Sequence, residues 1–274
     1  MTTRYTILGA SGFIGSHLVS HLQAAGHECH SPLRGDETLF TMPLGHVIYC
    51  VGLTADFRSR PLETVEAHVC LLRRLLAQGN FASLTYLSST RVYARASVAH
   101  ESATLSVNPN EFDDLYNLSK LMGESLCLHG GRANARVVRL SNIVGLRPDP
   151  DIFIDQLLEE GRRTGRVVLR TALSSRKDYL YIEDAVSALA QIAGSAAQGI
   201  INVASGEGVE NREIVRFLEA QMGFSVEVIP NAPVWDFTAV DTGRLNTEFS
   251  ISPRRFADYF PEFLQHYCRD KGLS

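Results

Sequence analysis

Short apolar stretches alternate with amphipathic helical patterns along the first part of the chain. Residues 5–8 form a β-rich run, and Ile14, Leu18 and Leu22 then recur every four residues, on one face of a helix that ends before Gly26. Further strands are predicted at 27–32, 46–51, 83–88, 135–140 and 199–204, and further helices at 61–78, 113–129 and 183–194. The inward side of the helix at 61–78 is predicted to consist of Val65, Val69, Leu72 and Leu76. This order predicts an α/β fold with a doubly wound parallel sheet, covered by helices on both faces.

The pattern changes after Pro148. The elements predicted beyond it are a helix at 152–164, a strand at 167–170, a helix capped by Asn211 and closed by Gly223, a strand at 226–228 and a helix near 254–268. We expect residues 1–147, completed by 178–204, to form a Rossmann-type dinucleotide-binding domain. Residues 148–177 and 205–274 are expected to form a smaller C-terminal substrate-binding lobe. Ligands of open α/β sheets bind in the crevice at the C-terminal edge of the strands, which this lobe would cover.

A glycine-rich turn, Gly-Ala-Ser-Gly-Phe-Ile-Gly at residues 9–15, separates the first predicted strand from the first helix. Glycines allow a tight turn, close approach of the backbone to a pyrophosphate, and close packing of helix on strand. The start of the helix offers free N–H groups and positive potential to the phosphates. This strand–turn–helix context predicts dinucleotide binding. The residues expected to contact the dinucleotide are Gly9, Ser11, Gly12, Phe13, Ile14 and Gly15.

The end of the second predicted strand bears on which dinucleotide is expected. An acidic residue there would hold the ribose 2′-hydroxyl of NAD, but that place falls at Leu33, and Arg34 follows. Arg34 can meet the 2′-phosphate of NADP with charge-assisted hydrogen bonds, whereas Asp36 could still serve a ribose. We therefore expect NADP, with NAD as the alternative. The segment 35–45 is too short for a full helix plus a strand, so the adenine pocket is expected to be open or differently built.

Tyr116 and Lys120 lie four residues apart in the helix predicted at 113–129, and therefore on one face of it. A free phenol has a pKa of about 10 and exchanges protons poorly at neutral pH. A fixed cation beside it stabilises the phenolate, so we expect Lys120 to lower the pKa of Tyr116 toward the working range.

Residues 87–93, Leu-Ser-Ser-Thr-Arg-Val-Tyr, follow a predicted buried strand. Together with the glycine turn and the Tyr116–Lys120 pair, they resemble the extended short-chain dehydrogenase/reductases, the NAD-dependent epimerase/dehydratase family. The resemblance covers nearly the whole chain. It includes Arg-Leu-Ser-Asn-Ile-Val-Gly at 139–145, Arg-Lys-Asp-Tyr-Leu-Tyr-Ile-Glu-Asp at 176–184 and Asn-Val-Ala-Ser-Gly at 202–206.

The resemblance implies a catalytic trio of Ser89, Tyr116 and Lys120. In the family pattern the catalytic hydroxyl lies three residues before Val92, which selects Ser89 rather than its neighbour Ser88. Tyr116 would exchange a proton with the substrate oxygen as hydride moves to or from the nicotinamide. Ser89 would hydrogen-bond the same oxygen. Lys120 would hold the nicotinamide ribose and so belongs to the expected cofactor-binding residues as well.

The residues after the catalytic hydroxyl bear on the reaction type. Family members that eliminate water from a sugar carry an Asp-Glu pair there, whereas this chain carries Thr90 and Arg91. Dehydration is therefore disfavoured. What remains is oxidation–reduction at a carbinol or ketone, which means either a net ketone reduction or an epimerisation through a transient ketone.

The expected substrate-binding residues are Thr90, Asn142, Arg176 and Lys177. Asn142 matches a family asparagine that contacts the sugar nucleotide. Arg176 or Lys177 falls where the family presents a cation to the substrate diphosphate: register favours Lys177, and the planar fork of arginine favours Arg176. A second family arginine falls at Pro233 and is missing.

Reduction of a keto group on a nucleotide-linked sugar is the expected activity. The alternatives are a nucleotide-sugar epimerase that retains its cofactor, a reductase of a small carbonyl compound, and a non-enzymatic dinucleotide sensor. The sensor would have no need of the residues at 89, 116 and 120.

Composition bears on the binding partners and the cellular compartment that we expect. The net charge of −4 and the isoelectric point near 6.1 give no nucleic-acid footprint. No apolar run is long enough to span a bilayer and no signal peptide pattern is present, so a cytoplasmic protein is expected. The five scattered cysteines indicate neither a disulfide framework nor a zinc site, and no metal is expected. The family resemblance suggests a homodimer through the helices at 61–78 and 113–129.

Overall fold

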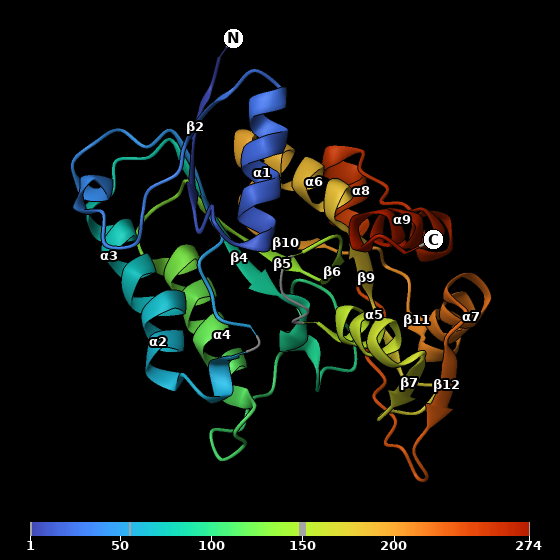
Figure 1. The fold of residues 1–274 in the computed structure, drawn as a ribbon. Coiled ribbons are helices and arrows are strands. Elements are labelled where there is room, and N and C mark those ends of the chain that lie inside the picture. Colours follow the sequence, from blue (N-terminus) through green and yellow to red (C-terminus); the bar gives the residue numbers. More distant parts are fainter. Residues whose placement is uncertain (1, 55, 148–151, 274) are drawn as a thin grey trace.

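A six-stranded parallel sheet forms the centre of the molecule (Figure 1). The computed structural model describes residues 2–54, 56–147 and 152–273. The strands are β1 (Arg4–Leu8), β2 (Glu28–His30), β3 (His46–Tyr49), β4 (Ser83–Ser89), β5 (Ala135–Leu140) and β10 (Gly199–Val203). Their order is β10-β5-β4-β3-β1-β2, and every neighbouring pair is parallel. The order runs outward in both directions from β1 and β3, so the predicted doubly wound fold is confirmed.

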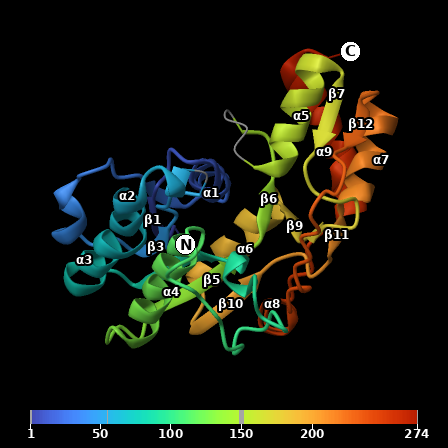
Figure 2. The same cartoon turned by 90° about the horizontal axis from the view of Figure 1, so that it is seen from below.

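Successive residues of the strands point to opposite apolar layers, which is why both faces of the sheet need a cover. Ile48 packs with α1 (Phe13–Ala24) and α6 (Ile182–Gly194), whereas its neighbours Val47 and Tyr49 pack with α3 (Leu71–Gln78) and α4 (Asp114–His129). Val138 and Val137 in β5 divide in the same way. Figure 2 shows these helices and the sheet from below.

The helix predicted at 61–78 is interrupted. It consists of α2 (Pro61–Val65), a π-helical turn (Glu66–Cys70) and α3. A π turn takes more residues than an α turn, which shifts the inward side by one position before it. The prediction that Val65 and Val69 face inward is therefore wrong, because both are only half-buried. The buried residues are Thr64, Ala67, His68, Leu72, Leu75 and Leu76.

The connection between β2 and β3 contains a short 3₁₀ helix, Glu37–Phe40, and no full helix, as its length predicts. Asp36 caps it: one carboxylate oxygen accepts hydrogen bonds from the backbone N–H and the hydroxyl of Thr38, at 2.9 and 2.6 Å. These bonds lower the pKa of Asp36.

The smaller lobe is assembled from separate stretches of the chain. Its elements are α5 (Phe153–Thr164), β7 (Arg166–Leu169), β8 (Arg176–Lys177), β11 (Val209–Glu210), α7 (Asn211–Met222), β12 (Ser225–Val228) and α9 (Phe256–Lys271). β7 pairs with β12 in parallel, and β8 pairs with β11 in antiparallel orientation. A parallel pair of β6 (Asn142–Val144) and β9 (Tyr179–Tyr181) connects the lobe to the sheet. The expected domain boundary near Pro148 lies outside the described residues.

Two details of the lobe differ from the sequence-based expectation. Asn211 is the first residue of α7 rather than its cap, and its amide donates to the Thr171 hydroxyl and the Ala172 carbonyl, both at 2.9 Å. Helix α8 (Gly243–Phe249) returns to the sheet and packs against β10. Arg244 in α8 donates to the carbonyls of Gln198 and Ile200, which is a structural role.

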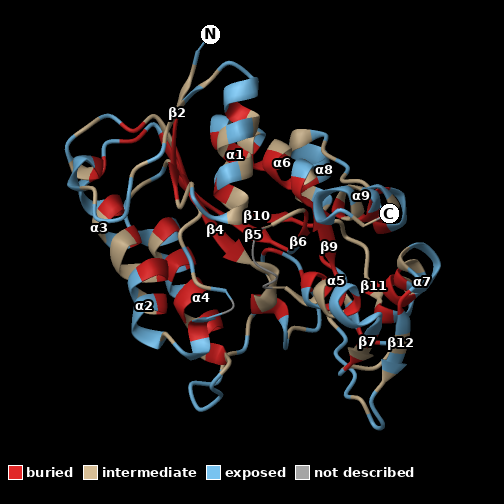
Figure 3. Cartoon of the chain, in the orientation of Figure 1, coloured by how far each residue is buried: buried red, intermediate tan, exposed pale blue. Residues whose placement is uncertain are grey.

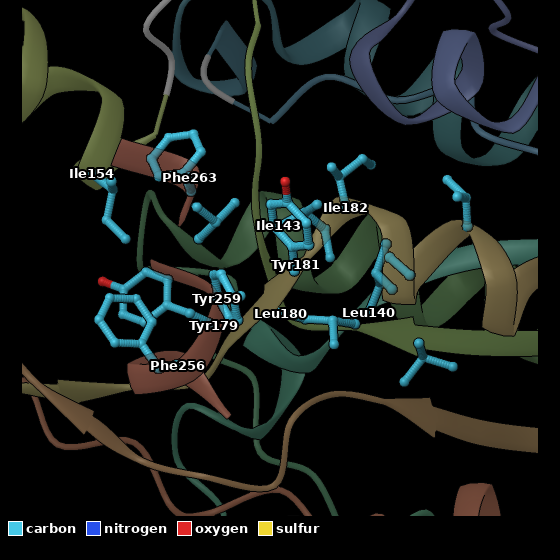
Figure 4. Close-up of a cluster of buried hydrophobic side chains, with 14 of the residues drawn as sticks. Leu140, Ile143, Ile154, Tyr179, Leu180, Tyr181, Ile182, Phe256, Tyr259 and Phe263 are labelled. Atoms are coloured by element: carbon cyan, nitrogen blue, oxygen red, sulfur yellow. The ribbon is translucent and has the colours of Figure 1, made fainter. Parts of the chain in front are cut away.

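One continuous apolar core joins the sheet to the lobe. Buried residues run through the junction (Figure 3). Leu140, Ile143 and Ile182 lie on the sheet side of it, and Ile154 and the aromatic residues of α9 lie on the lobe side (Figure 4). Tyr181 of β9 stacks on Tyr259 of α9, with ring centroids 5.0 Å apart. Apolar packing through β6, β9 and α9 therefore joins the lobe to the sheet. Among the described residues, no helix combines the length and apolarity needed to cross a membrane.

Candidate active site

The glycine turn connects β1 to α1 with the geometry that a dinucleotide needs. Gly9 has φ +81°, which favours glycine, and a Cβ on Gly15 would lie 2.2 Å from the Gly9 carbonyl oxygen. No side chain caps α1, so the first N–H groups of the helix stay available. Ser11 and Gly12 are exposed, and Phe13 and Ile14 are half-buried. All six predicted residues therefore lie in one turn whose helix N–H groups carry no side-chain cap, and their contact with a dinucleotide stays a prediction.

Arg34 lies in an exposed turn after β2. No hydrogen bond or ion pair joins it to another residue in the described part of the chain, so its guanidinium is open to a ligand. Asp36 differs, because its carboxylate is occupied in capping the 3₁₀ helix.

Tyr116 and Lys120 lie on the inner face of α4, and they are only 4% and 5% exposed. The Lys120 ammonium lies 5.9 Å from the centroid of the Tyr116 ring and donates to the Leu87 carbonyl of β4 at 2.9 Å. The prediction that the two residues share one helix face is confirmed.

The expected direction of the Tyr116 pKa is wrong for this structure. Burial raises the pKa of Tyr116 above its usual 10.0, and hydrogen bonds from Ser89 and Thr54 and the charge of Arg91 only partly oppose the rise. Burial also lowers the pKa of Lys120 from 10.5 to about 7, with Glu124 opposing. Burial of the phenol therefore outweighs the groups that favour the phenolate, and the Lys120 ammonium is directed at the Leu87 carbonyl.

Ser88 and Ser89 have different partners. The Ser88 hydroxyl donates to the Glu124 carboxylate at 2.5 Å, and Arg139 forms a bidentate pair with the same carboxylate at 3.0 and 2.6 Å. Ser89 ends β4, hydrogen-bonds Tyr116 and accepts the backbone N–H of Arg91 at 3.2 Å. Ser88 is therefore committed to a buried structural network, and Ser89 is the serine next to the phenol.

His68, in the π turn, supports Tyr116 from a second side. Its ring lies edge-on to the Tyr116 ring, with centroids 5.4 Å apart. Nε2 accepts the backbone N–H of Leu53 at 3.3 Å, and Nδ1 lies 2.8 Å from the Ser119 hydroxyl, which donates to the Tyr116 carbonyl at 2.9 Å. Burial lowers the pKa of His68 to about 2, with Lys120 adding to the effect, so the imidazole is neutral.

Arg91 supplies a second cation close to the Tyr116 ring, in addition to Lys120. Its guanidinium lies 5.4 Å from the Tyr116 ring centroid and 5.1 Å from that of Phe57. One ion pair, to Asp113 at 3.3 Å, compensates its charge.

The two candidate cations of β8 have different surroundings, as alternation along a strand requires. Lys177 Nζ lies 5.0 Å from the Phe153 ring and 5.4 Å from the Trp235 ring, and no carboxylate pairs with it among the described residues. Burial lowers the pKa of Lys177, and the charge of Arg91 adds to this. Arg176 instead pairs with Glu210 at 3.1 Å and lines an open cavity of about 660 Å³ beside α7. The structure thus brings Lys177, and not Arg176, toward the Arg91 side of the molecule.

Asn142 and Thr90 lie near the same edge of the sheet. Asn142 is exposed at the start of β6, and its amide donates to the Asp178 carbonyl at 2.8 Å. Thr90 is half-buried directly after Ser89.

Thr54, His68 and Arg91 are site residues that the sequence did not identify. Thr54 lies in a loop and His68 in a π turn, where no periodic pattern marks a function. Arg91 could have been identified from the sequence, because it replaces an acidic residue of the dehydratases.

Known proteins resemble this chain over most of its length. The sequence profile of the NAD dependent epimerase/dehydratase family matches residues 5–204. The chain is 26% identical over 266 residues to the GDP-6-deoxy-D-mannose reductase of Pseudomonas aeruginosa, which covers 84% of this chain and 83% of that protein. It is 25% identical to the dTDP-6-deoxy-L-talose 4-dehydrogenase (NAD(P)(+)) of Kitasatospora kifunensis, with 87% and 85% covered.

Solved structures share the fold. MoeE5 in complex with UDP-glucuronic acid and NAD superimposes with a TM-score of 0.83 at 21% identity, over 98% of this chain and 99% of that one. RMD from Pseudomonas aeruginosa complexed with NADPH superimposes with a TM-score of 0.74 at 24% identity, over 92% and 94%. These similarities confirm the Rossmann-type fold.

Proposed function

The chain belongs to the NAD dependent epimerase/dehydratase family, and on that premise we propose that it reduces a keto group on the sugar of a nucleotide-linked sugar. It is an NAD(P)-dependent oxidoreductase or epimerase. The observation that carries the proposal is the convergence of Ser89, Tyr116 and Lys120 beside the glycine turn. The two relatives named above, a reductase and a 4-dehydrogenase of deoxysugar nucleotides, support the substrate class.

Each residue has a defined part in the reduction. Ser89 hydrogen-bonds the carbonyl oxygen of the substrate, and Tyr116 donates its phenolic proton to that oxygen as the carbonyl carbon is reduced. A bound nicotinamide supplies the hydride. The residues of the glycine turn would hold the pyrophosphate, and Lys120 would hold the nicotinamide ribose. Burial excludes water from the proton transfer.

We propose NADP as the preferred cofactor. The supporting observation is Arg34, which is exposed after β2 and free of partners in the described residues. Asp36, the residue that could have favoured NAD, already caps the 3₁₀ helix.

For the substrate diphosphate, we propose Lys177 and not Arg176. Lys177 is a partly buried ammonium with no anionic partner among the described residues, which leaves its charge to be neutralised by a ligand. Arg176 is already paired with Glu210. Asn142 and Thr90 lie where they can contact the sugar portion.

A paired substitution tests this assignment. Trp235 is the single tryptophan of the chain and lies next to Lys177, so its fluorescence reports ligand binding there. We expect Lys177→Ala to weaken binding of a nucleoside diphosphate about tenfold or more, because a charge-assisted bond is lost. Arg176→Ala, at the adjacent position, is the matched control and should bind normally. The reverse result would assign the diphosphate to Arg176.

Turnover tests the function itself. Nucleotide-linked keto sugars with different bases are supplied with NADPH, and both NADPH consumption and the sugar product are followed. We expect stoichiometric consumption with at least one of them, and Tyr116→Phe should reduce kcat about 100- to 10,000-fold with NADPH binding retained. Isomerised sugar without net consumption would identify an epimerase instead. Unchanged turnover in Tyr116→Phe would contradict the proposal.

A further inference from the structure

We propose that Arg91 is a positioning residue of the catalytic site, which holds the Tyr116 ring and supports the phenolate formed when Tyr116 gives up its proton. The inference rests on the proposed function, because it concerns the same proton donor. It adds a residue from the 3₁₀ helix after β4 (Thr90–Tyr93) to the catalytic trio, which β4 and α4 supply.

Three contacts fix Arg91 at this place. The guanidinium lies 5.4 Å from the centroid of the Tyr116 ring and 5.1 Å from that of Phe57, whose rings are themselves 5.4 Å apart. Its backbone N–H donates to the Ser89 hydroxyl at 3.2 Å. One residue therefore contacts the proton donor through its side chain and orients the neighbouring hydroxyl through its backbone.

The phenolate needs this support because the lysine gives little of it. The Lys120 ammonium is directed at the Leu87 carbonyl, and burial lowers the pKa of Lys120 to about 7, so its charge is incomplete at neutral pH. A guanidinium stays charged at every working pH. Arg91 is a fixed charge; Asp113 pairs with it at 3.3 Å, and the charge of Asp114 also acts on it.

Most of the other groups around Tyr116 carry no charge. His68 is neutral, and Ser89 and Thr54 offer hydroxyl groups. Tyr86 is buried and its pKa is raised well above the usual value, first by burial. The Asp113 carboxylate is shared with Arg58, at 2.7 and 2.8 Å. The charges of Asp114 and Lys177 also act on Arg91 or are affected by it. Arg91 and Lys120 are thus the two cations that act directly on the phenol.

Arg58 provides a matched control. It is bound to the same carboxylate as Arg91 and lies 4.5 Å from the same Phe57 ring, but it does not contact Tyr116. Replacing Arg58 therefore perturbs the same ion-pair cluster without removing a charge from the phenol.

The test is a direct titration of Tyr116 in the folded protein. The protein is labelled with ¹³Cζ-tyrosine, and the Tyr116 resonance is identified by its absence in Tyr116→Phe. We expect Arg91→Gln to raise the pKa of Tyr116 by about one unit, the effect of a unit charge about 6 Å away in a partly hydrated site. Arg91→Lys and Arg58→Gln should titrate like the wild type. Equal titration of Arg91→Gln and the wild type would overturn the proposal, as would an equal shift in Arg58→Gln.

If Arg91→Gln does not fold, a second variant, which should shift the pKa of Tyr116 in the opposite direction, tests the proposal. Asp113→Asn leaves the charge of Arg91 less compensated and should lower the pKa of Tyr116. An unchanged or higher value would overturn the proposal. This titration needs no substrate, so it can succeed or fail whether or not any keto sugar is turned over. With a substrate in hand, the pH at which kcat/KM of the reduction declines should move upward in Arg91→Gln by the same amount.

Discussion

A single charged side chain, Arg34, is the residue on which the choice of cofactor depends. Replacing it with alanine removes the only charge proposed to contact a 2′-phosphate. We expect Arg34→Ala to weaken NADPH binding at least about tenfold and to leave NADH binding nearly unchanged. Fluorescence titration of both nucleotides measures the ratio. Equal weakening of the two would show that Arg34 does not distinguish them, and Leu33→Ala, at the adjacent exposed position, serves as the control.

Lys120 makes stability depend on pH. Its pKa is lowered from 10.5 in the unfolded chain to about 7 in the folded one, so the cost of burying the charge is full below pH 7. Between these values the unfolded chain binds more protons, and the stability of the folded state rises with pH. Relative to Lys120→Met, the wild type should gain on the order of 3 kcal/mol between pH 7 and pH 10. Urea unfolding of both proteins without cofactor measures the difference, and a constant difference would contradict the lowered pKa.

At the scale of single residues, local spacing predicts which side chains meet but not how they are stabilised. The four-residue spacing of Tyr116 and Lys120 placed both on one helix face, as the structure has them. The direction of the Tyr116 pKa was wrong, because depth of burial is set by the whole fold and no local pattern encodes it. In the sequence, register favoured Lys177 and side-chain chemistry favoured Arg176; the pairing of β8 with β11 and the different partners of the two side chains now separate them.

At the scale of elements, helices and strands were predicted correctly where the periodic pattern of apolar residues extends over enough positions. The six strands of the sheet and the long helices were all located, with boundaries displaced by a few residues. The very short strands β6, β8, β9 and β11 were missed, because two or three residues cannot display a period. The π turn was missed for another reason: an inserted residue changes the phase of a helix without changing its composition. That shift is what buries His68 beside Tyr116 and leaves Val65 and Val69 half-buried.

The neighbouring helices α2 and α4 expose apolar side chains, and we propose that these form a homodimer interface. Leu62 is 82% exposed and Met122 is 54% exposed, on two helices that contact each other. Leu118, one turn before Met122, is half-buried on the same side of α4. An apolar stripe across two neighbouring helices is suited to a symmetric contact with a second copy.

For the whole molecule, the expected mass in solution is twice the 30.2 kDa of one chain. Met122→Glu places a charge in the proposed interface and should shift the protein to monomers, as measured by sedimentation at several concentrations. Ile229→Glu, which adds the same charge at a half-exposed apolar site after β12, is the control and should stay dimeric. A wild type that sediments as a monomer would refute the proposed interface.

The order of strands in the sheet differs from the order in which a ribosome produces them. The edge partner of β5 is β10, yet α5 and β7 are synthesised between the two. A nascent chain that has reached Leu140 therefore carries an open β5 edge, and unpaired backbone groups at such an edge invite association with other chains. The aromatic residues of α9, which close the core around Tyr181, are synthesised after every strand of the central sheet. The core between the sheet and the lobe is thus completed only after α9 has been made.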